Sequence, residues 1–153
     1  MASDRRQVVI AGGKRTPVGA FQGSLATVPA TRLGATAIQA ALEVSGVSGD
    51  SVDEVIMGNV VSAGGGQAPA RQAAVNGGVP ATIPALTINK VCGSGLKAVM
   101  LAAQAVRAGD ARRVLAGGME SVSNVPFYAR GLRDGVNLGN QTLEDGHIHD
   151  GLW

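Results

Sequence analysis

Residues 85–108 read ALTINKVCGSGLKAVMLAAQAVRA, and this stretch carries the clearest structural signal in the sequence. Its first part, residues 85–91, is a short, largely apolar run that predicts a buried strand. Its last part, residues 96–108, is dense in alanine, leucine, valine and methionine and predicts a helix. Cys92 lies between the two, so the stretch indicates a strand–turn–helix unit with a thiol at its turn.

The same alternation of apolar runs and helical segments extends along the first 119 residues. The expected strands are 8–11, 52–61, 85–91 and 114–116, and the expected helices are 32–45, 68–76 and 96–108. Thr31 is expected to cap the first helix, and Pro69 suits the first turn of the second. This order predicts an α/β fold with a mostly parallel sheet and helices on both faces. Ligands bind such sheets beyond the carboxyl ends of the strands, where Cys92 falls.

The pattern changes from about Glu120. Glycines recur there without a steady period, and the sequence stops on the large apolar residues Leu152 and Trp153. A domain more often ends in a finished element or a polar tail. We therefore divide the chain into residues 1–119 and 120–153, and we expect the natural polypeptide to continue past Trp153.

Composition limits the classes of function. Of the 153 residues, 45% are hydrophobic and 16% are charged, which is typical of a folded globular protein. The net charge is +2 and the basic residues are scattered, so we expect no nucleic-acid binding. A single cysteine allows no internal disulfide, and no stretch reads as a signal peptide or a membrane span. We expect a cytoplasmic protein without membrane association.

Cys92 is the leading candidate for a catalytic residue. The helix that begins after it has N-terminal amides that favour a nearby negative charge. A thiolate there would be a nucleophile, and backbone amides of the same turn could support an oxyanion during acyl transfer. The alternative is a small, buried, apolar cysteine, which is the usual state of a lone cysteine. The residues alone leave both interpretations open.

A different ligand is suggested by residues 93–98, whose spacing Gly-x-Gly-x-x-Ala fits the dinucleotide-binding fingerprint after a strand. Glu120, just past the next strand, would imitate the ribose-binding acid. The fingerprint usually occupies the first strand–helix turn, and residues 12–15 lack it. It also leaves the thiol before the glycines unexplained.

His147 and His149 could bind a metal if they lay at alternate positions of a strand. A pair of histidines in a loop is more often solvated surface, and we expect no metal. Nothing in the sequence places either histidine as a base for Cys92. Met100 and Met119 are expected to fill the core.

Residues 89–99, NKVCGSGLKAV, resemble the nucleophile segment of the thiolase family, particularly of acetyl-CoA acetyltransferases. Four further segments resemble that family in the family's order: residues 9–19, 66–73, 117–123 and 150–153. The resemblance therefore covers essentially the whole chain. It implies the N-terminal half of an αβαβα layered fold, in which residues 1–119 lack their last strand and residues 120–153 begin a truncated loop domain.

The resemblance also implies an activity. Cys92 would accept an acetyl group from acetyl-CoA, and its backbone amide would contribute to an oxyanion hole. A second acetyl-CoA would then attack to form acetoacetyl-CoA, and the reverse reaction would cleave it. Leu152 resembles a leucine that contacts the coenzyme. The substrates would be coenzyme A thioesters, with no metal or other cofactor, and the full-length enzyme would be a homodimer or homotetramer.

The sequence departs from the family in what it lacks. The sequence lacks the Gly-His-Pro motif, which carries the activating histidine in the family, and the Cys-x-Gly-Gly motif, which carries the second catalytic cysteine. It also lacks the family's Asn-Glu-Ala-Phe motif. His147 and His149 match none of them. We therefore expect little or no turnover from the 153-residue chain alone. A non-catalytic module that pairs with another thiolase-like chain is the alternative.

Overall fold

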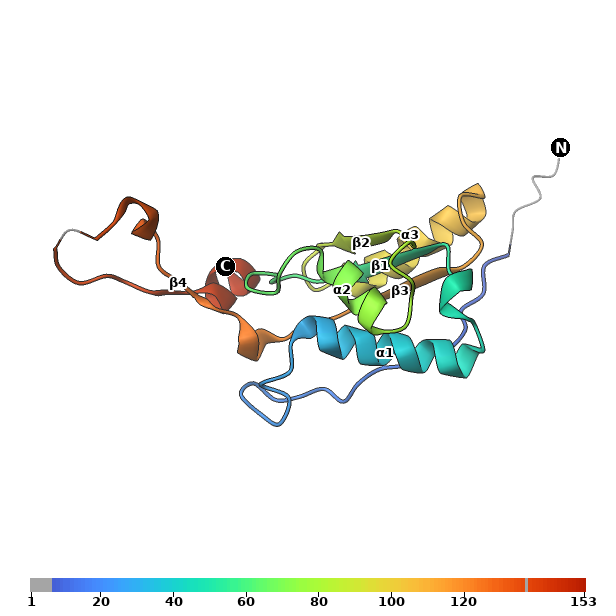
Figure 1. The fold of residues 1–153 in the computed structure, drawn as a ribbon, viewed down its shortest axis with the longest axis horizontal. Coiled ribbons are helices and arrows are strands. Elements are labelled where there is room, and N and C mark those ends of the chain that lie inside the picture. Colours follow the sequence, from blue (N-terminus) through green and yellow to red (C-terminus); the bar gives the residue numbers. More distant parts are fainter. Residues whose placement is uncertain (1–6, 137) are drawn as a thin grey trace.

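A parallel sheet forms the centre of the fold. The structure is a computed structural model that describes residues 7–136 and 138–153, and in this part of the chain the sheet has three strands. They are β1 (Glu54–Gly58), β2 (Ala85–Ile88) and β3 (Val114–Gly118), in the order β2–β1–β3 (Figure 1). Val55 pairs with Ala85 and Leu115 in parallel register, so the three carboxyl ends meet at one edge. The predicted α/β fold with a parallel sheet is confirmed.

Helices cover both faces of the sheet. They are α1 (Ala30–Ser45), α2 (Pro69–Asn76) and α3 (Ser94–Ala108). Val55 and Met57 point from β1 into the main apolar core, which they share with Ile38 of α1 and Ala73 of α2. Side chains alternate along a strand, so Ile56 points to the opposite face, where α3 packs against β1 and β3.

The two methionines expected in the core differ in burial. Met119 belongs to the main core and is only 7% exposed, as predicted. Met100 lies on α3 and is 49% exposed, so its placement in the core was wrong. The dense apolar composition of α3 hides which of its faces meets the sheet, and that face is made of the small residues Ala98 and Ala102.

The helix ends agree with the sequence except at the start of α1. Gly46 and Gly109 follow α1 and α3 in the left-handed conformation, as expected of glycines that end a helix. Thr31 as a cap was wrong, because Pro29 is the extended residue before α1 and its carbonyl accepts the first helical amides. Thr31 lies inside the first turn and is buried.

The strand expected at residues 8–11 does not form. Val9 and Ile10 are each 82% exposed, and the segment runs beside α1 instead of joining the sheet (Figure 1). A Cβ built on Gly12 would lie 2.5 Å from the carbonyl oxygen of Ala41 in α1, which shows how closely the two approach. An apolar run forms a strand only when a neighbouring strand pairs with it, and residues 8–11 pair with none of the three strands of the sheet.

The chain after β3 forms an arm that extends away from the sheet (Figure 1). β4 (Phe127–Tyr128) and β5 (Glu144–Asp145) pair antiparallel, and Arg130 forms a 2.6 Å salt bridge with Glu144. Short helical turns lie at Val122–Asn124, Leu132–Asp134 and Ile148–Leu152. The last turn returns to the carboxyl edge of the sheet, where a Cβ on Gly151 would lie 3.2 Å from a methyl group of Val61. The division into domains at residue 119 stays a prediction.

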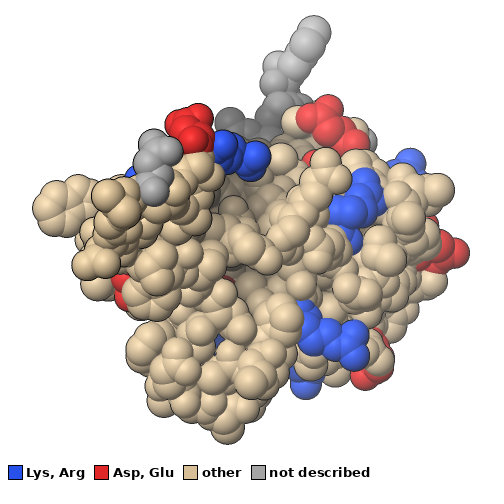
Figure 2. Space-filling model, turned by 60° about the vertical axis from the view of Figure 1, so that its left-hand side comes forward, with Lys and Arg blue, Asp and Glu red and all other residues tan. Residues whose placement is uncertain are grey.

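Surface charge is dispersed on the face shown in Figure 2, where Lys and Arg side chains lie among larger areas of uncharged atoms. None of the helices in residues 7–136 and 138–153 combines the length and apolar character that a membrane crossing requires. That the protein is cytoplasmic and binds no nucleic acid stays a prediction.

Candidate active site

The turn between β2 and α3 places Cys92 at the amino end of α3. Its thiol is free and exposed, so the alternative of a buried apolar cysteine is wrong. Within the described residues, the backbone amide of Cys92 donates to no protein acceptor. Because α3 has 15 residues, its first amides present a partial positive charge beside the thiol.

Val91, directly before Cys92, has a left-handed backbone with a φ of +47°. A β-branched residue rarely adopts this conformation, which costs about 1–3 kcal/mol. The Asn89 Oδ1 accepts a hydrogen bond from the Val91 amide at 2.8 Å. The Ser94 hydroxyl donates to the Val91 carbonyl at 2.6 Å and accepts from the Lys90 amide at 2.9 Å. Strain that the surrounding structure holds in place in this way clusters at functional sites.

Three glycines let α3 begin directly on the ends of the strands. A Cβ on Gly58 of β1 would lie 2.6 Å from the Cβ of Ser94 and 2.8 Å from the amide nitrogen of Gly95. A Cβ on Gly118 of β3 would lie 3.2 Å from the Cα of Gly95. Backbone contacts therefore hold the turn that carries Cys92 on β1 and β3.

Cys92 lines an open cavity of about 440 Å³. The cavity walls come from the Cys92 turn, the ends of β1 and β3, and the returning C-terminal segment. Beyond the turn itself they include Val60, Val61, Met119, Glu120, His147 and Gly151. An exposed thiol beside an open cavity is accessible to a thioester, and the cavity has room for the group that the thiol would carry.

Glu120 is a half-buried carboxylate in the wall of this cavity. Its Oε2 accepts from the Val60 amide at 2.8 Å, and its Oε1 accepts from the Val61 amide at 3.2 Å and from Asn59 Nδ2 at 2.8 Å. Burial raises the pKa of Glu120 above its usual value, while these hydrogen bonds and the nearby His147 oppose that rise. The sequence analysis considered Glu120 only as a ribose-binding acid. Its place at the same carboxyl edge as Cys92 could have marked it as part of one site.

His147 lines the cavity with Cys92, whereas His149 does not. The His147 ring lies 5.9 Å from the Phe21 ring, centroid to centroid. His149 is exposed, and its Nε2 lies 2.7 Å from Nη2 of Arg130. His149 lies on the solvated surface as expected, whereas His147 is partly exposed in the wall of the open cavity. Which histidine faces the cavity depends on how the chain folds back after β5, and the sequence pattern does not contain that information.

The last residues are helical, so the two histidines do not occupy alternate positions of a strand. Among residues 7–136 and 138–153, no group of three or more His, Cys, Asp or Glu side chains is arranged to hold a metal ion. That the protein uses no metal or other cofactor stays a prediction.

Leu152 does not line the cavity, and its side chain is 70% exposed. Its neighbour Gly151 does line the cavity. The expected contact between Leu152 and coenzyme A stays a prediction.

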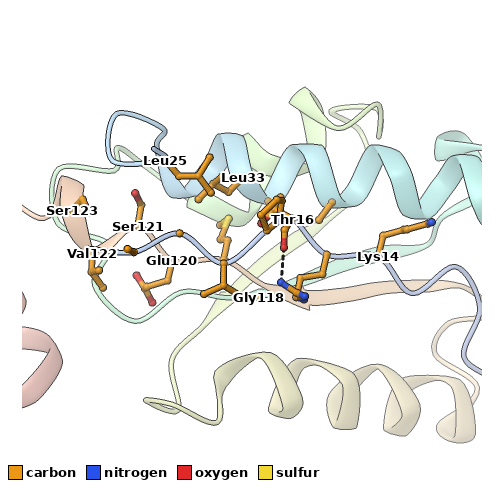
Figure 3. A pocket seen from close by; sticks show the side chains of 17 residues that line it. Lys14, Thr16, Leu25, Leu33, Gly118, Glu120, Ser121, Val122 and Ser123 are labelled. Carbon is orange, nitrogen blue, oxygen red and sulfur yellow. Dashed lines mark hydrogen bonds between the residues drawn. The ribbon is translucent and has the colours of Figure 1, made fainter. Parts of the chain in front are cut away.

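A second cavity, of about 260 Å³, shares the wall formed by residues 118–120 with the first (Figure 3). Residues 14–20 and the first half of α1 form its other walls. Figure 3 shows Leu25 and Leu33 on the α1 side and the Glu120 carboxylate directed away from them. Cys92 does not line this second cavity.

The fold and the site define an α/β domain with an exposed thiol at a helix start, and comparison with known proteins shows its family. Residues 8–153 match the family model described as thiolase, N-terminal domain. The chain is 60% identical over 146 residues to an acetyl-CoA acetyltransferase of Cupriavidus necator. It is 53% identical over 148 residues to an acetyl-CoA acetyltransferase of Pseudomonas aeruginosa and to acetyl-CoA acetyltransferase 2 of Arabidopsis thaliana.

The chain therefore belongs to the thiolase family, and the matched part is the N-terminal domain of that family. The three alignments cover 95%, 97% and 97% of this chain. They cover 37%, 38% and 37% of the relatives, so the chain spans little more than a third of their length.

Proposed function

We propose that Cys92 is the acyl-accepting nucleophile of a thiolase-type acyltransferase that acts on acetyl-CoA. The observation that carries the proposal is the exposed Cys92 thiol at the start of α3, open to a cavity of about 440 Å³. Membership of the thiolase family supports it. The relatives named above are acetyl-CoA acetyltransferases, which supports acetyl-CoA as the substrate.

The first half-reaction transfers an acetyl group to Cys92. The thiolate attacks the thioester carbonyl carbon, a new bond forms between carbon and the Cys92 sulfur, and the carbonyl oxygen becomes an oxyanion. The Cys92 amide, which has no protein acceptor in the described residues, is available to donate to that oxyanion. When the intermediate collapses, the bond to the coenzyme A sulfur breaks, and the departing thiolate takes up the proton that Cys92 lost.

The second half-reaction joins two acetyl groups. The enolate of a second acetyl-CoA attacks the acyl carbon on Cys92, a carbon–carbon bond forms, and acetoacetyl-CoA leaves as the Cys92 thiolate is restored. The reverse sequence is thiolysis. The sequence lacks the Gly-His-Pro motif, whose histidine activates the nucleophile in the family. It also lacks the Cys-x-Gly-Gly motif, whose cysteine acts as acid and base there, and forming the enolate needs a base. We therefore expect the 153-residue chain to accept one acetyl group but to turn over slowly or not at all.

The acetyl transfer is tested by incubating the chain with acetyl-CoA and weighing the intact protein by mass spectrometry. Cys92 is the only cysteine, so a hydroxylamine-sensitive acetyl group identifies its position. Cys92→Ser is the control and should carry no such group. A folded chain whose thiol reacts with iodoacetamide but takes up no acetyl group from acetyl-CoA would count against the proposal.

We also propose that the full-length enzyme forms homodimers or homotetramers. Leu96 and Met100 lie one turn apart on α3 and are both exposed, Leu96 to 69%. Leu86 on β2 and Val91 before Cys92 are exposed as well. Large apolar side chains that are exposed on one protein surface are typical of protein interfaces. Leu96→Glu should shift the mass measured by light scattering towards the monomer, with the exposed Val44→Glu on α1 as the control.

The alternative, a non-catalytic module that pairs with a thiolase-like chain, predicts the same pairing without acetylation. The two experiments together separate these functions. A full-length wild-type protein that stays monomeric at every concentration would contradict the proposed homo-oligomer.

A further inference from the structure

We infer that Glu120 is a positioning residue for the turn that carries Cys92, and that it acts through residues 59–61 and through Asn89. The inference deepens the function proposed above, and its meaning for acyl transfer rests on Cys92 being the nucleophile. The contacts that carry it are independent of that function.

The contacts form a continuous chain from the carboxylate to the turn. Glu120 accepts the amides of Val60 and Val61, at 2.8 and 3.2 Å. The carbonyl oxygen of Val60 accepts a hydrogen bond from Asn89 Nδ2 at 3.2 Å. The Oδ1 of the same Asn89 accepts from the amide of Val91 at 2.8 Å. Two intermediaries, Val60 and Asn89, therefore connect Glu120 to the residue that precedes Cys92.

The chemistry of the first contact requires a carboxylate. Three donors converge on Glu120, namely two adjacent backbone amides and the Nδ2 of Asn59, which is itself buried. Glutamine has one acceptor oxygen and would present an NH₂ group to donors, so at least one of them would lose its partner. Burial raises the pKa of Glu120, so the site keeps a carboxyl group that is costly to ionise there. A carboxyl group kept where ionisation is costly points to a specific role more strongly than an exposed carboxyl group does.

The chain of contacts ends at Val91, whose backbone conformation sets the position of the Cys92 thiol. Val91 has a φ of +47°, which its own side chain disfavours, so the conformation depends on the bonds that hold it. If Asn89 loses its fixed position, the turn relaxes and the thiol no longer stays aligned with the first amides of α3. A relaxed turn should therefore lower the reactivity of Cys92, because the sulfur no longer stays beside the partial positive charge of those amides.

The molecule contains a matched control for a purely structural role. Asp53, just before β1, also accepts two adjacent backbone amides, those of Arg112 and Arg113, at 2.7 and 2.8 Å. It joins β1 to β3 at the amino ends of the strands, opposite to the edge that carries Cys92. A carboxylate that only fastens the sheet should leave the reactivity of Cys92 unchanged, at whichever end of the sheet it lies.

The experiment measures the rate at which iodoacetamide alkylates Cys92 in the 153-residue chain at neutral pH. Glu120→Gln and Asp53→Asn are compared with the wild type at a temperature where circular dichroism shows each to be folded. We expect Glu120→Gln to slow alkylation about two- to fivefold, because the sulfur is no longer held beside the first amides of α3. Glu120→Asp keeps both acceptor oxygens and should recover part of the rate. Asp53→Asn should leave the rate unchanged.

A second variant tests the route through Asn89. Asn89→Asp keeps the acceptor for the Val91 amide and removes the donor to the Val60 carbonyl, so it cuts the connection to Glu120. It also adds a negative charge near Cys92, so the single variant Asn89→Asp is the reference for the double variant. In that background Glu120→Gln should slow alkylation no further, because contacts on one route do not add. If Glu120→Gln does not fold, Glu120→Asp takes its place in both comparisons, and it should slow alkylation in the wild-type background but not in the Asn89→Asp background.

The alkylation measurements would overturn the inference in either of two ways: equal rates for Glu120→Gln and Asp53→Asn, or fully additive effects of Glu120→Gln and Asn89→Asp. Acetylation by acetyl-CoA is measured on the same samples. A chain that is never acetylated but whose alkylation follows Glu120 would refute only the proposed function. A chain that is acetylated at the wild-type rate in Glu120→Gln would refute only the positioning role.

Discussion

The end of β1 and the start of α3 meet at Gly58 and Ser94, so closely that a Cβ on Gly58 would lie 2.6 Å from the Cβ of Ser94. Ser94 is buried, and its hydroxyl bonds to the backbone of both Lys90 and Val91. A side chain at Gly58 must therefore displace the same residue that holds the turn before Cys92.

Gly58→Ala should lower the free energy of unfolding by about 1–3 kcal/mol, because the added methyl group overpacks a contact made by backbone atoms. It should also change the alkylation rate of Cys92, because Ser94 has to move. Chemical denaturation and iodoacetamide kinetics measure the two effects. Gly13→Ala is the control, since a Cβ there would have no atom within 4 Å, and it should change neither quantity.

Val91→Gly should leave the stability unchanged or raise it by up to about 1 kcal/mol. Glycine removes a left-handed strain of about 1–2 kcal/mol, which offsets the roughly 0.5–1 kcal/mol of added chain entropy in the unfolded state. Val75→Gly, in the ordinary right-handed backbone of α2, is the matched control and should be destabilising. Equal losses in the two variants would show that Val91 is unstrained.

Met119→Ala should lower the free energy of unfolding by about 2–5 kcal/mol, because it empties part of the core between α1 and the sheet. Met100→Ala on the exposed face of α3 should stay within about 0.5 kcal/mol of the wild type. Urea denaturation of both variants provides the measurement. A large loss in Met100→Ala would mean that α3 buries that face in solution, as it would in an oligomer.

Asp53 should make stability depend on pH in the acid range. The amides of Arg113 and Arg112 donate to its carboxylate and hold the pKa of Asp53 below its ordinary value of 3.8. A lowered pKa in the folded state stabilises the protein above pH 3.8, and this contribution is lost as the pH falls through the lower folded value. The difference in Tm between the wild type and Asp53→Asn should therefore be largest near neutral pH and shrink in acid. If the Tm difference stays constant from neutral to acid pH, the ionised carboxylate of Asp53 is not its cause.

The sequence predicted most of the fold because each element between residues 30 and 118 carries a local signal. The apolar runs of β1, β2 and β3 and the glycines after α1 and α3 depend on near neighbours in the chain. Residues 8–11 carry the same apolar signal but form no strand, because a strand needs a partner and, among the described residues, this segment pairs with none of β1, β2 and β3. A local pattern does not report whether a partner is present.

The candidate site was predicted in part for the same reason. Cys92 was found because the strand before it and the helix after it are both local. Glu120 and His147 line the same cavity from positions 28 and 55 residues further along the chain, and the folding of the arm brings His147 there. The close contact of Gly58 with Ser94 likewise depends on how β1 and α3 pack together. A glycine at the end of an apolar run is not enough to predict it.

In the part of the chain that the structure describes, β3 pairs with β1 on one side and with no strand on the other. The open side presents a row of backbone groups that another extended chain could adopt as its partner. The unpaired backbone groups of β3 are therefore expected to promote aggregation of the purified protein. A concentrated solution should form aggregates through strand pairing over days. A short peptide designed to pair with β3 should prevent this aggregation.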